Sequence, residues 1–136
     1  MLFLDVTRNA ILNGSIPTEW STMRDLEFAL FKQNNLMGSL PSTWSELQKL
    51  RVIDVTSNVH LSGTLPPSWS AMQSLLWLDA ADTGFYGLIP DEWNHGMVSI
   101  ERIDLRNQHR TSMHIDPICV DSAASDTRLA SGVALL

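Results

Sequence analysis

One phrase of twelve residues recurs along this chain and constrains its fold more than any other feature. The phrase is most complete at residues 61–72, Leu-Ser-Gly-Thr-Leu-Pro-Pro-Ser-Trp-Ser-Ala-Met, and it returns at 12–23, at 36–47 and, more loosely, at 85–93. Its tryptophans lie 24, 25 and 24 residues apart, at Trp20, Trp44, Trp69 and Trp93. A fixed period in the twenties predicts a solenoid, because one such unit is too small to bury its own apolar face.

A short strand pattern precedes each phrase. Residues 50–58, Leu-Arg-Val-Ile-Asp-Val-Thr-Ser-Asn, place apolar side chains at the first, fourth and sixth positions, as a strand with one buried face does. Equivalent segments begin at residues 1, 26, 75 and 100. Strand and phrase together match the leucine-rich repeat pattern L-x-x-L-x-L-x-x-N-x-L. We therefore expect an α/β-type leucine-rich repeat solenoid, with short parallel strands on its concave face and a helix-poor, irregular convex face.

The repeat boundaries predict one domain and a tail. The 136 residues suffice for a single domain, and a content of 44% apolar residues is typical of globular proteins. The solenoid is expected to span residues 1–120, with repeats at about 1–25, 26–49, 50–74 and 75–99 and a partial repeat at 100–120. Residues 121–136 are expected to form a C-terminal tail. No apolar run is long enough to span a membrane, and a net charge of −6 disfavours duplex nucleic acid as a partner.

Two further columns of the repeat have expected structural roles. The asparagines Asn9, Asn34 and Asn58 follow the strands, where their amides can satisfy backbone groups of their own coil and of the next. Thr83 and Gln108 replace asparagine in the last two units, so this ladder is expected to loosen toward the C-terminus. The four tryptophans of the phrase are expected to close the convex layer.

The strand side chains that point away from the core predict a binding face. The third strand position forms a mainly aromatic stripe, and the fifth forms an acidic column with Lys32 beside it. The predicted ligand-binding residues are Phe3, Asp5, Phe28, Lys32, Val52, Asp54, Trp77, Asp79, Arg102 and Asp104. An exposed apolar stripe rimmed by charge is typical of an interaction surface. The alternative is that such residues only suit a pleated surface and that the aspartates provide solubility.

Catalytic and metal chemistry is not expected. The aspartates suit Ca²⁺ chemically, but neighbouring strands would hold them about 4.8 Å apart in a row rather than in a cage. His109, His114, Asp116 and the single cysteine, Cys119, match no standard zinc spacing, and one cysteine forms no intrachain disulfide. A Cys–His nucleophile would need an orienting group and an oxyanion site, and no phosphate-binding loop or serine elbow is present. We expect no enzyme activity, no metal and no cofactor.

The phrase also carries a family likeness. Leu-Ser-Gly-Thr-Leu-Pro after an asparagine resembles the plant-type leucine-rich repeats, and Pro-Pro-Ser-Trp-Ser-Ala-Met at residues 66–72 is similar to the surface antigen and proteophosphoglycan proteins of trypanosomatid parasites. That resemblance implies a secreted or glycolipid-anchored surface protein that acts in adhesion and host interaction. The chain shows no signal peptide, no paired cysteines and no Ser/Thr/Pro-rich stalk, so a cytoplasmic location is the alternative. Asn13-Gly-Ser is a glycosylation acceptor if the protein is secreted, and otherwise serves only the turn.

These features predict a non-enzymatic recognition or adhesion module with a protein or glycan partner on the concave sheet. The alternative is a structural, self-associating repeat protein. Met1 falls inside a repeat, so the first strand is expected to be an uncapped edge through which a homo-oligomer could form.

Overall fold

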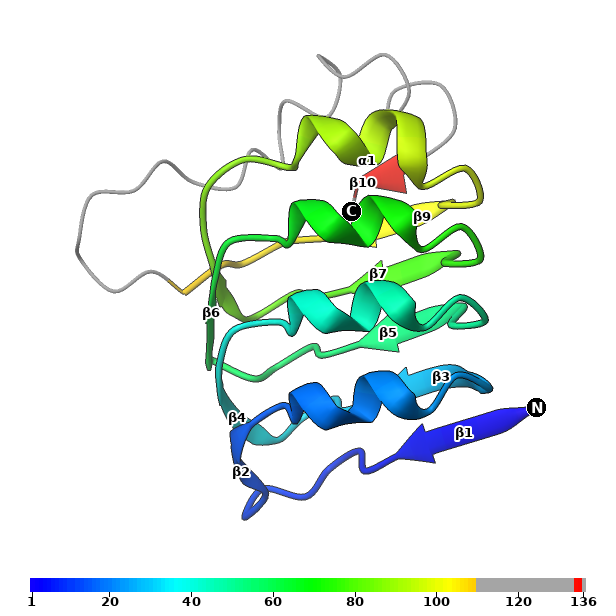
Figure 1. The fold of residues 1–136 in the computed structure, drawn as a ribbon. Coiled ribbons are helices and arrows are strands. Elements are labelled where there is room, and N and C mark those ends of the chain that lie inside the picture. Colours follow the sequence, from blue (N-terminus) through cyan, green and yellow to red (C-terminus); the bar gives the residue numbers. More distant parts are fainter. Residues whose placement is uncertain (110–133, 136) are drawn as a thin grey trace.

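The structure, a computed structural model, describes residues 1–109 and 134–135. Each of the first four coils contributes one strand to a first sheet, one strand to a second sheet and one short helical turn, and the coils stack along a single axis (Figure 1). In the described residues the fifth coil contributes β9 to the first sheet. This is the predicted leucine-rich repeat solenoid, with parallel strands and little helix.

The first sheet is wholly parallel and has six strands. Its order is β1 (Leu2–Asp5), β3 (Leu26–Leu30), β5 (Val52–Asp54), β7 (Trp77–Asp79), β9 (Arg102–Asp104) and β10 (Ala134–Leu135). The first five are the strands predicted from the repeat. The sixth, β10, comes from the segment expected to be a tail and pairs with β9. The predicted domain boundary at residue 120 lies outside the described residues and stays a prediction.

A second parallel sheet, which the sequence pattern did not predict, lies along the edge of the solenoid (Figure 1). Its order is β2 (Asn13–Ser15), β4 (Asn35–Gly38), β6 (His60–Gly63) and β8 (Gly84–Phe85). β4 and β6 end on a glycine with positive φ, and at Gly63 the φ of +100° is one that other residues rarely adopt. A Cβ on Gly63 would also lie 3.1 Å from that of Ser39 in the preceding coil. Glycine therefore permits both the bend and the close stacking of coils.

Helical turns form the convex side. Three are 3₁₀ turns, η1 (Thr18–Thr22), η2 (Ser42–Glu46) and η3 (Pro67–Ala71), and the fourth is the short α-helix α1 (Asp91–Gly96). In η3 the amide of Met72 bonds the carbonyl of Trp69, three residues earlier, whereas in α1 the amide of Met97 bonds that of Trp93, four residues earlier. The bonded turn of α1 thus contains one residue more than that of η3, which makes it an α turn rather than a 3₁₀ turn.

Gly96 makes room for the wider turn of α1. A Cβ at this position would overlap the carbonyl oxygen of Ser70 in η3. Only a residue without a side chain lets the wider turn pack directly on the coil below it.

The core consists of side-chain columns that run through the coils. Leu4, Ala29, Ile53, Leu78 and Ile103 are paired in register from strand to strand, as predicted. All except Leu4 are fully buried. Each coil thus buries its apolar face on its neighbours.

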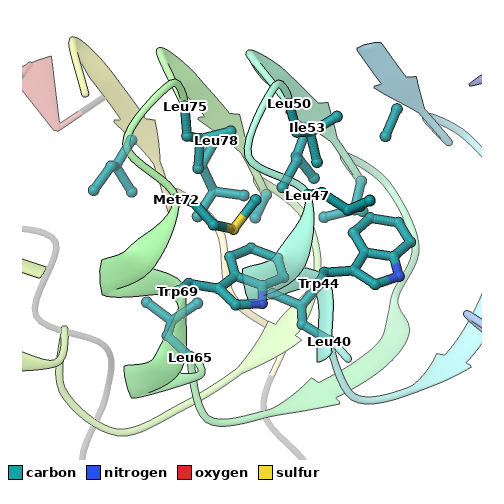
Figure 2. Packing of buried hydrophobic residues seen from close by; sticks show 14 of the residues in the cluster. Leu40, Trp44, Leu47, Leu50, Ile53, Leu65, Trp69, Met72, Leu75 and Leu78 are labelled. Carbon is teal, nitrogen blue, oxygen red and sulfur yellow. The ribbon is translucent and has the colours of Figure 1, made fainter. Parts of the chain in front are cut away.

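The tryptophan column closes the opposite side of the core, as predicted. Trp44 and Trp69 are fully buried and Trp93 almost so. The rings of Trp44 and Trp69 stack with centroids 6.4 Å apart, and those of Trp69 and Trp93 with centroids 6.2 Å apart. Figure 2 shows the Trp44 and Trp69 rings beside Leu40, Leu47 and Leu65, which lie just before or after the helical turns. The indole N–H groups of Trp44, Trp69 and Trp93 donate to the carbonyls of Pro17, Pro41 and Pro66, at 3.4, 2.9 and 2.9 Å, so each of these three rings joins its coil to the preceding one.

The asparagine ladder differs from the prediction in two respects. The amide of Asn58 donates to Val55 O in its own coil and to Phe31 O in the preceding coil, at 2.8 and 2.9 Å. The ladder therefore bonds the coil before it, and the expectation of bonds to the next coil was wrong. Gln108 repeats the pattern by donating to Leu105 O and Ala80 O, at 3.0 and 2.9 Å. Its longer side chain takes over the asparagine's bonds, so the expected loosening is wrong at Gln108. At Thr83 the loosening is confirmed, because within the described part of the chain its hydroxyl bonds Ala80 O and Gln108 and makes no bond to the preceding coil.

Candidate recognition face

The stripe predicted on the concave sheet is a true structural row. The register pairs Phe3 with Phe28, Phe28 with Val52, and Val52 with Trp77, and Trp77 lies opposite Arg102. We call Phe3, Phe28, Val52 and Trp77 the aromatic stripe. The four side chains share one face because the coils repeat in phase and alternate strand residues point to the same side.

The aromatic stripe is exposed at its two ends. Phe3 keeps 54% of its surface accessible and stacks on Phe28 with ring centroids 4.3 Å apart and planes 13° from parallel. Trp77 keeps 43% accessible, whereas Val52, between Phe28 and Trp77, keeps only 8%. The expectation of a continuously exposed stripe is therefore corrected. Aromatic side chains therefore lie on both sides of the buried Val52. Phe28 and Trp77 are separated by two strand spacings, about 10 Å.

The acidic column, Asp5, Asp54, Asp79 and Asp104, also follows the register, with Leu30 in the second coil. Three of these carboxylates shape the backbone after their strands. Asp5 Oδ1 accepts from the amide of Thr7 at 2.9 Å, Asp54 Oδ1 from that of Thr56 at 3.0 Å, and Asp104 Oδ1 from that of Arg106 at 3.1 Å. Hydrogen bonding from Thr7 holds the pKa of Asp5 below its ordinary value. The aspartates thus favour the turn that leaves the sheet, a role that Asp-x-Thr at two of the strand ends could have indicated.

Arginines neutralise the C-terminal half of the acidic column. Arg106 forms two side-chain hydrogen bonds with Asp104, at 2.8 and 3.0 Å, and Arg102 lies 3.1 Å from Asp79. Asp104 keeps only 3% of its surface accessible, so its predicted role in ligand contact is not supported by its position. Burial raises the pKa of the Asp79 carboxyl, and the charge of Arg102 offsets the rise only in part.

The N-terminal half of the acidic column keeps its charge. Among the ion pairs of the described residues none includes Asp5 or Asp54. Asp54 is half-buried, Asp5 is exposed, and the predicted contact residue Lys32 is exposed in the coil between them. Asp5 and Asp54 are therefore the carboxylates of this column that no ion pair in the described part of the chain neutralises, and the exposed cation Lys32 lies between them.

A hollow lies at the rim, where the loops enter the first sheet. It has a volume of about 380 Å³ and is lined by Glu27, Lys49, Arg51, Ser74 and Ser99. Its cations already have local partners, because Lys49 bonds Asp25 at 2.6 Å and Arg51 lies 4.0 Å from Glu27. The hollow therefore offers less unpaired charge than the concave face.

The structure does not bring potential metal ligands together in the part of the chain that it describes. No group of three His, Cys, Asp or Glu side chains there could hold an ion. His109 lies 3.9 Å from Asp82, while His114, Asp116 and Cys119 lie outside the described residues.

Solved structures with a similar fold include plant receptor ectodomains. The leucine-rich repeat ectodomain of the Arabidopsis thaliana receptor kinase GASSHO1/SCHENGEN3, in complex with Casparian strip integrity factor 2, matches with a TM-score of 0.71 and 27% identity. That match covers 93% of this chain and 14% of the other. The ectodomain of the A. thaliana receptor kinase SOBIR1 matches with a TM-score of 0.67 and 26% identity, over 79% of this chain and 57% of its own.

A plant ice-binding protein matches with a TM-score of 0.68 and 28% identity, over 79% of this chain and 34% of its own. This chain therefore spans less than two thirds of the length of each of these three proteins. No family model and no curated protein sequence matches it.

The parallel coils, the asparagine ladder and these likenesses define a plant-type leucine-rich repeat domain, structurally similar to plant receptor ectodomains. This domain also carries the stacked tryptophan column and the aromatic stripe. None of the described helices is long and apolar enough to cross a bilayer.

Proposed function

We propose that this chain is a non-enzymatic recognition module that binds a protein or glycan partner through its concave sheet. The observation that carries the proposal is the exposure of Trp77, which keeps 43% of its surface accessible in line with the Phe3–Phe28 stack. Large, rigid aromatic side chains supply much of the binding energy at protein interfaces. Trp44, Trp69 and Trp93 are buried in the core, which leaves Trp77 as the better placed anchor.

The charges beside the aromatic stripe favour a partner that carries both apolar and basic groups. Asp54 lies one strand from Trp77 and two residues further along, a separation of about 8 Å. A segment that packs an apolar side chain on Trp77 could therefore bring a cation to Asp54. The GASSHO1/SCHENGEN3 ectodomain, which has the same fold, is solved in complex with a factor, and this supports a similar use here.

Selection from a phage library of random peptides against the immobilised full chain tests this function. Selected peptides are expected to combine apolar and basic residues. Their affinity should fall at least about 30-fold, or ~2 kcal/mol, in Trp77→Ala, the usual threshold for a hot-spot residue. Leu88→Ala is a matched control, because Leu88 keeps 68% of its surface accessible and is not on the first sheet. Peptides that bind Trp77→Ala as tightly as the unaltered chain would refute the assignment of this face.

The acidic column is expected to set the rate of association more than the affinity. Asp54→Asn should slow association with a basic selected peptide at low salt, and the difference should shrink at high salt, because exposed charges are screened. If Asp54→Asn and the unaltered chain associate with the peptide at the same rate at low salt, Asp54 does not contribute to association.

We further propose a secreted or cell-surface location and a role in adhesion. The Pro-x-x-Trp-Ser-x-Met likeness to trypanosomatid surface antigens supports this location, as does structural similarity to receptor ectodomains. A cytoplasmic location is the alternative. Surface labelling of intact source cells with a membrane-impermeant reagent would mark the native protein only if it is exposed outside the cell.

A second candidate function, self-association, rests on exposed apolar side chains of the first sheet. Leu2 and Phe3 of β1 keep 44% and 54% of their surfaces accessible. Exposed apolar patches are common sites of association between chains. Sedimentation should then show a dimer that dissociates on dilution and is weakened by Leu2→Lys. A monomer at all concentrations would exclude this candidate.

A further inference from the structure

We infer that Asn13 is the acceptor of an N-linked glycan on the side of the solenoid that carries the second sheet. The inference rests on the proposed secreted or surface location, because the transferring enzyme acts in the secretory lumen. The motif is Asn13-Gly14-Ser15, the only Asn-x-Ser/Thr sequence in the chain.

The fold presents both functional groups of the motif to solvent. Asn13 and Ser15 are the first and last residues of β2, and both are exposed. Gly14 between them, with φ of +88°, would have open space around an added Cβ. The folded domain therefore has room at this position for a bulky sugar chain.

Other coils show that the asparagine is not required by the turn. The positions equivalent to Asn13 carry Met37, Ser62 and Tyr86, each followed by glycine, so the repeat tolerates chemically different residues here. Met37 and Ser62 are also followed two residues later by a hydroxyl, at Ser39 and Thr64. Only the first coil combines the amide and the hydroxyl.

The location of Asn13 keeps a glycan clear of the proposed recognition face. β2 lies along the side of the solenoid where the second sheet runs, away from the strands that carry Trp77 and Asp54 (Figure 1). A glycan at Asn13 would thus leave the concave face open to a partner.

The chemistry is the transfer of an oligosaccharide from a polyprenyl diphosphate donor. The side-chain nitrogen of Asn13 attacks the anomeric carbon of the first sugar, so that a C–N bond forms while the bond from that carbon to the diphosphate oxygen breaks. The polyprenyl diphosphate leaves with the electron pair. The amide nitrogen loses one proton to a base of the transferase.

The test uses the full chain, produced in eukaryotic secretory cells with a cleavable signal ahead of Met1 and a C-terminal tag that carries its own Asn-Ala-Thr acceptor. Only molecules whose tag is glycosylated are analysed, because the glycan on the tag shows that the molecule was exposed to the transferase. The glycan is detected on the intact glycopeptide, because an exposed Asn-Gly pair can deamidate spontaneously and imitate enzymatic deglycosylation.

The expected result is a glycan at Asn13 that is lost in Asn13→Gln and Ser15→Ala and retained in Ser15→Thr. Ser62→Asn completes a motif with Thr64 in the third coil and should add a second glycan. Tyr86→Asn completes none, because Leu88 follows, and should add nothing. An unmodified Asn13 in tag-glycosylated molecules would overturn the inference. Peptide binding by Trp77→Ala is measured separately, so failure of the glycan and failure of the recognition face are distinguishable.

Discussion

Replacement of Trp69 by alanine tests how the coils are held together. Trp69 is fully buried, its ring lies between those of Trp44 and Trp93, and its N–H donates to Pro41 O at 2.9 Å. Truncating a buried aromatic residue costs ~3–5 kcal/mol through lost transfer energy and the cavity left behind. The upper part of that range is expected here, because two flanking rings hold the cavity open and a buried carbonyl loses its donor.

Two further variants separate burial from hydrogen bonding. Trp69→Phe keeps most of the apolar contact but leaves Pro41 O without its donor, so it should cost ~1–3 kcal/mol. Trp20→Ala is the matched control, since Trp20 occupies the same position of the phrase but is only half-buried and stacks on Phe31 alone. It should cost clearly less than Trp69→Ala.

The assay is urea unfolding followed by far-ultraviolet circular dichroism, with the free energy of unfolding extrapolated at comparable slopes. Equal losses for Trp20→Ala and Trp69→Ala would show that position in the stack does not matter. A loss near zero for Trp69→Ala would refute the inter-coil role of the column altogether.

Three other predictions follow from single contacts. Asn58→Ala should lower the free energy of unfolding by about 3 kcal/mol, because two buried carbonyls and the amide of Leu36 lose their partner; a loss below about 1 kcal/mol by urea unfolding would argue against the ladder. Gly96→Ala should cost ~1–3 kcal/mol through the clash with the carbonyl of Ser70, while the exposed His95→Ala in the same helix should change stability by less than about 0.5 kcal/mol. The pKa of Asp79 is raised in the fold above its ordinary 3.8, so this carboxyl stabilises the fold when protonated, and the contribution is lost as the pH rises through the folded-state pKa. Asp79→Asn should therefore gain stability relative to the unaltered chain as the pH rises from about 3 to about 7, and an unchanged difference across that range would contradict the raised pKa.

The parts of the fold that depend on the repeat period could be predicted from the amino-acid sequence. Because the steps of 24 and 25 residues bring equivalent residues into register, the period alone places the Ile53 column and the row through Phe28 and Trp77. The second sheet could not be predicted in this way, because its strands are two to four residues long, include glycine, and do not alternate apolar with polar residues.

Some predicted contact residues differ from the expectation in their burial, because burial depends on side-chain contacts that the repeat period does not determine. Asp104 is buried because Arg106, two residues later, folds back on its carboxylate, while Asp54 at the same place in the repeat is followed by Thr56 and stays accessible. Val52 is smaller than its neighbours in the row and therefore lies lower than the rings beside it. Such differences between coils arise from individual side chains, so they appear only in the folded molecule.

The central claim, that the concave face is the recognition surface, is tested most directly by the indole N–H signals of the five tryptophans in a ¹H–¹⁵N correlation spectrum. Titration of the full chain with a selected peptide is predicted to shift or broaden the Trp77 signal, while the signals of the stacked Trp44 and Trp69 stay in place. If the peptide saturates the protein while the Trp77 signal is unmoved, or if the stacked tryptophans move instead, the binding surface lies elsewhere and the claim is wrong.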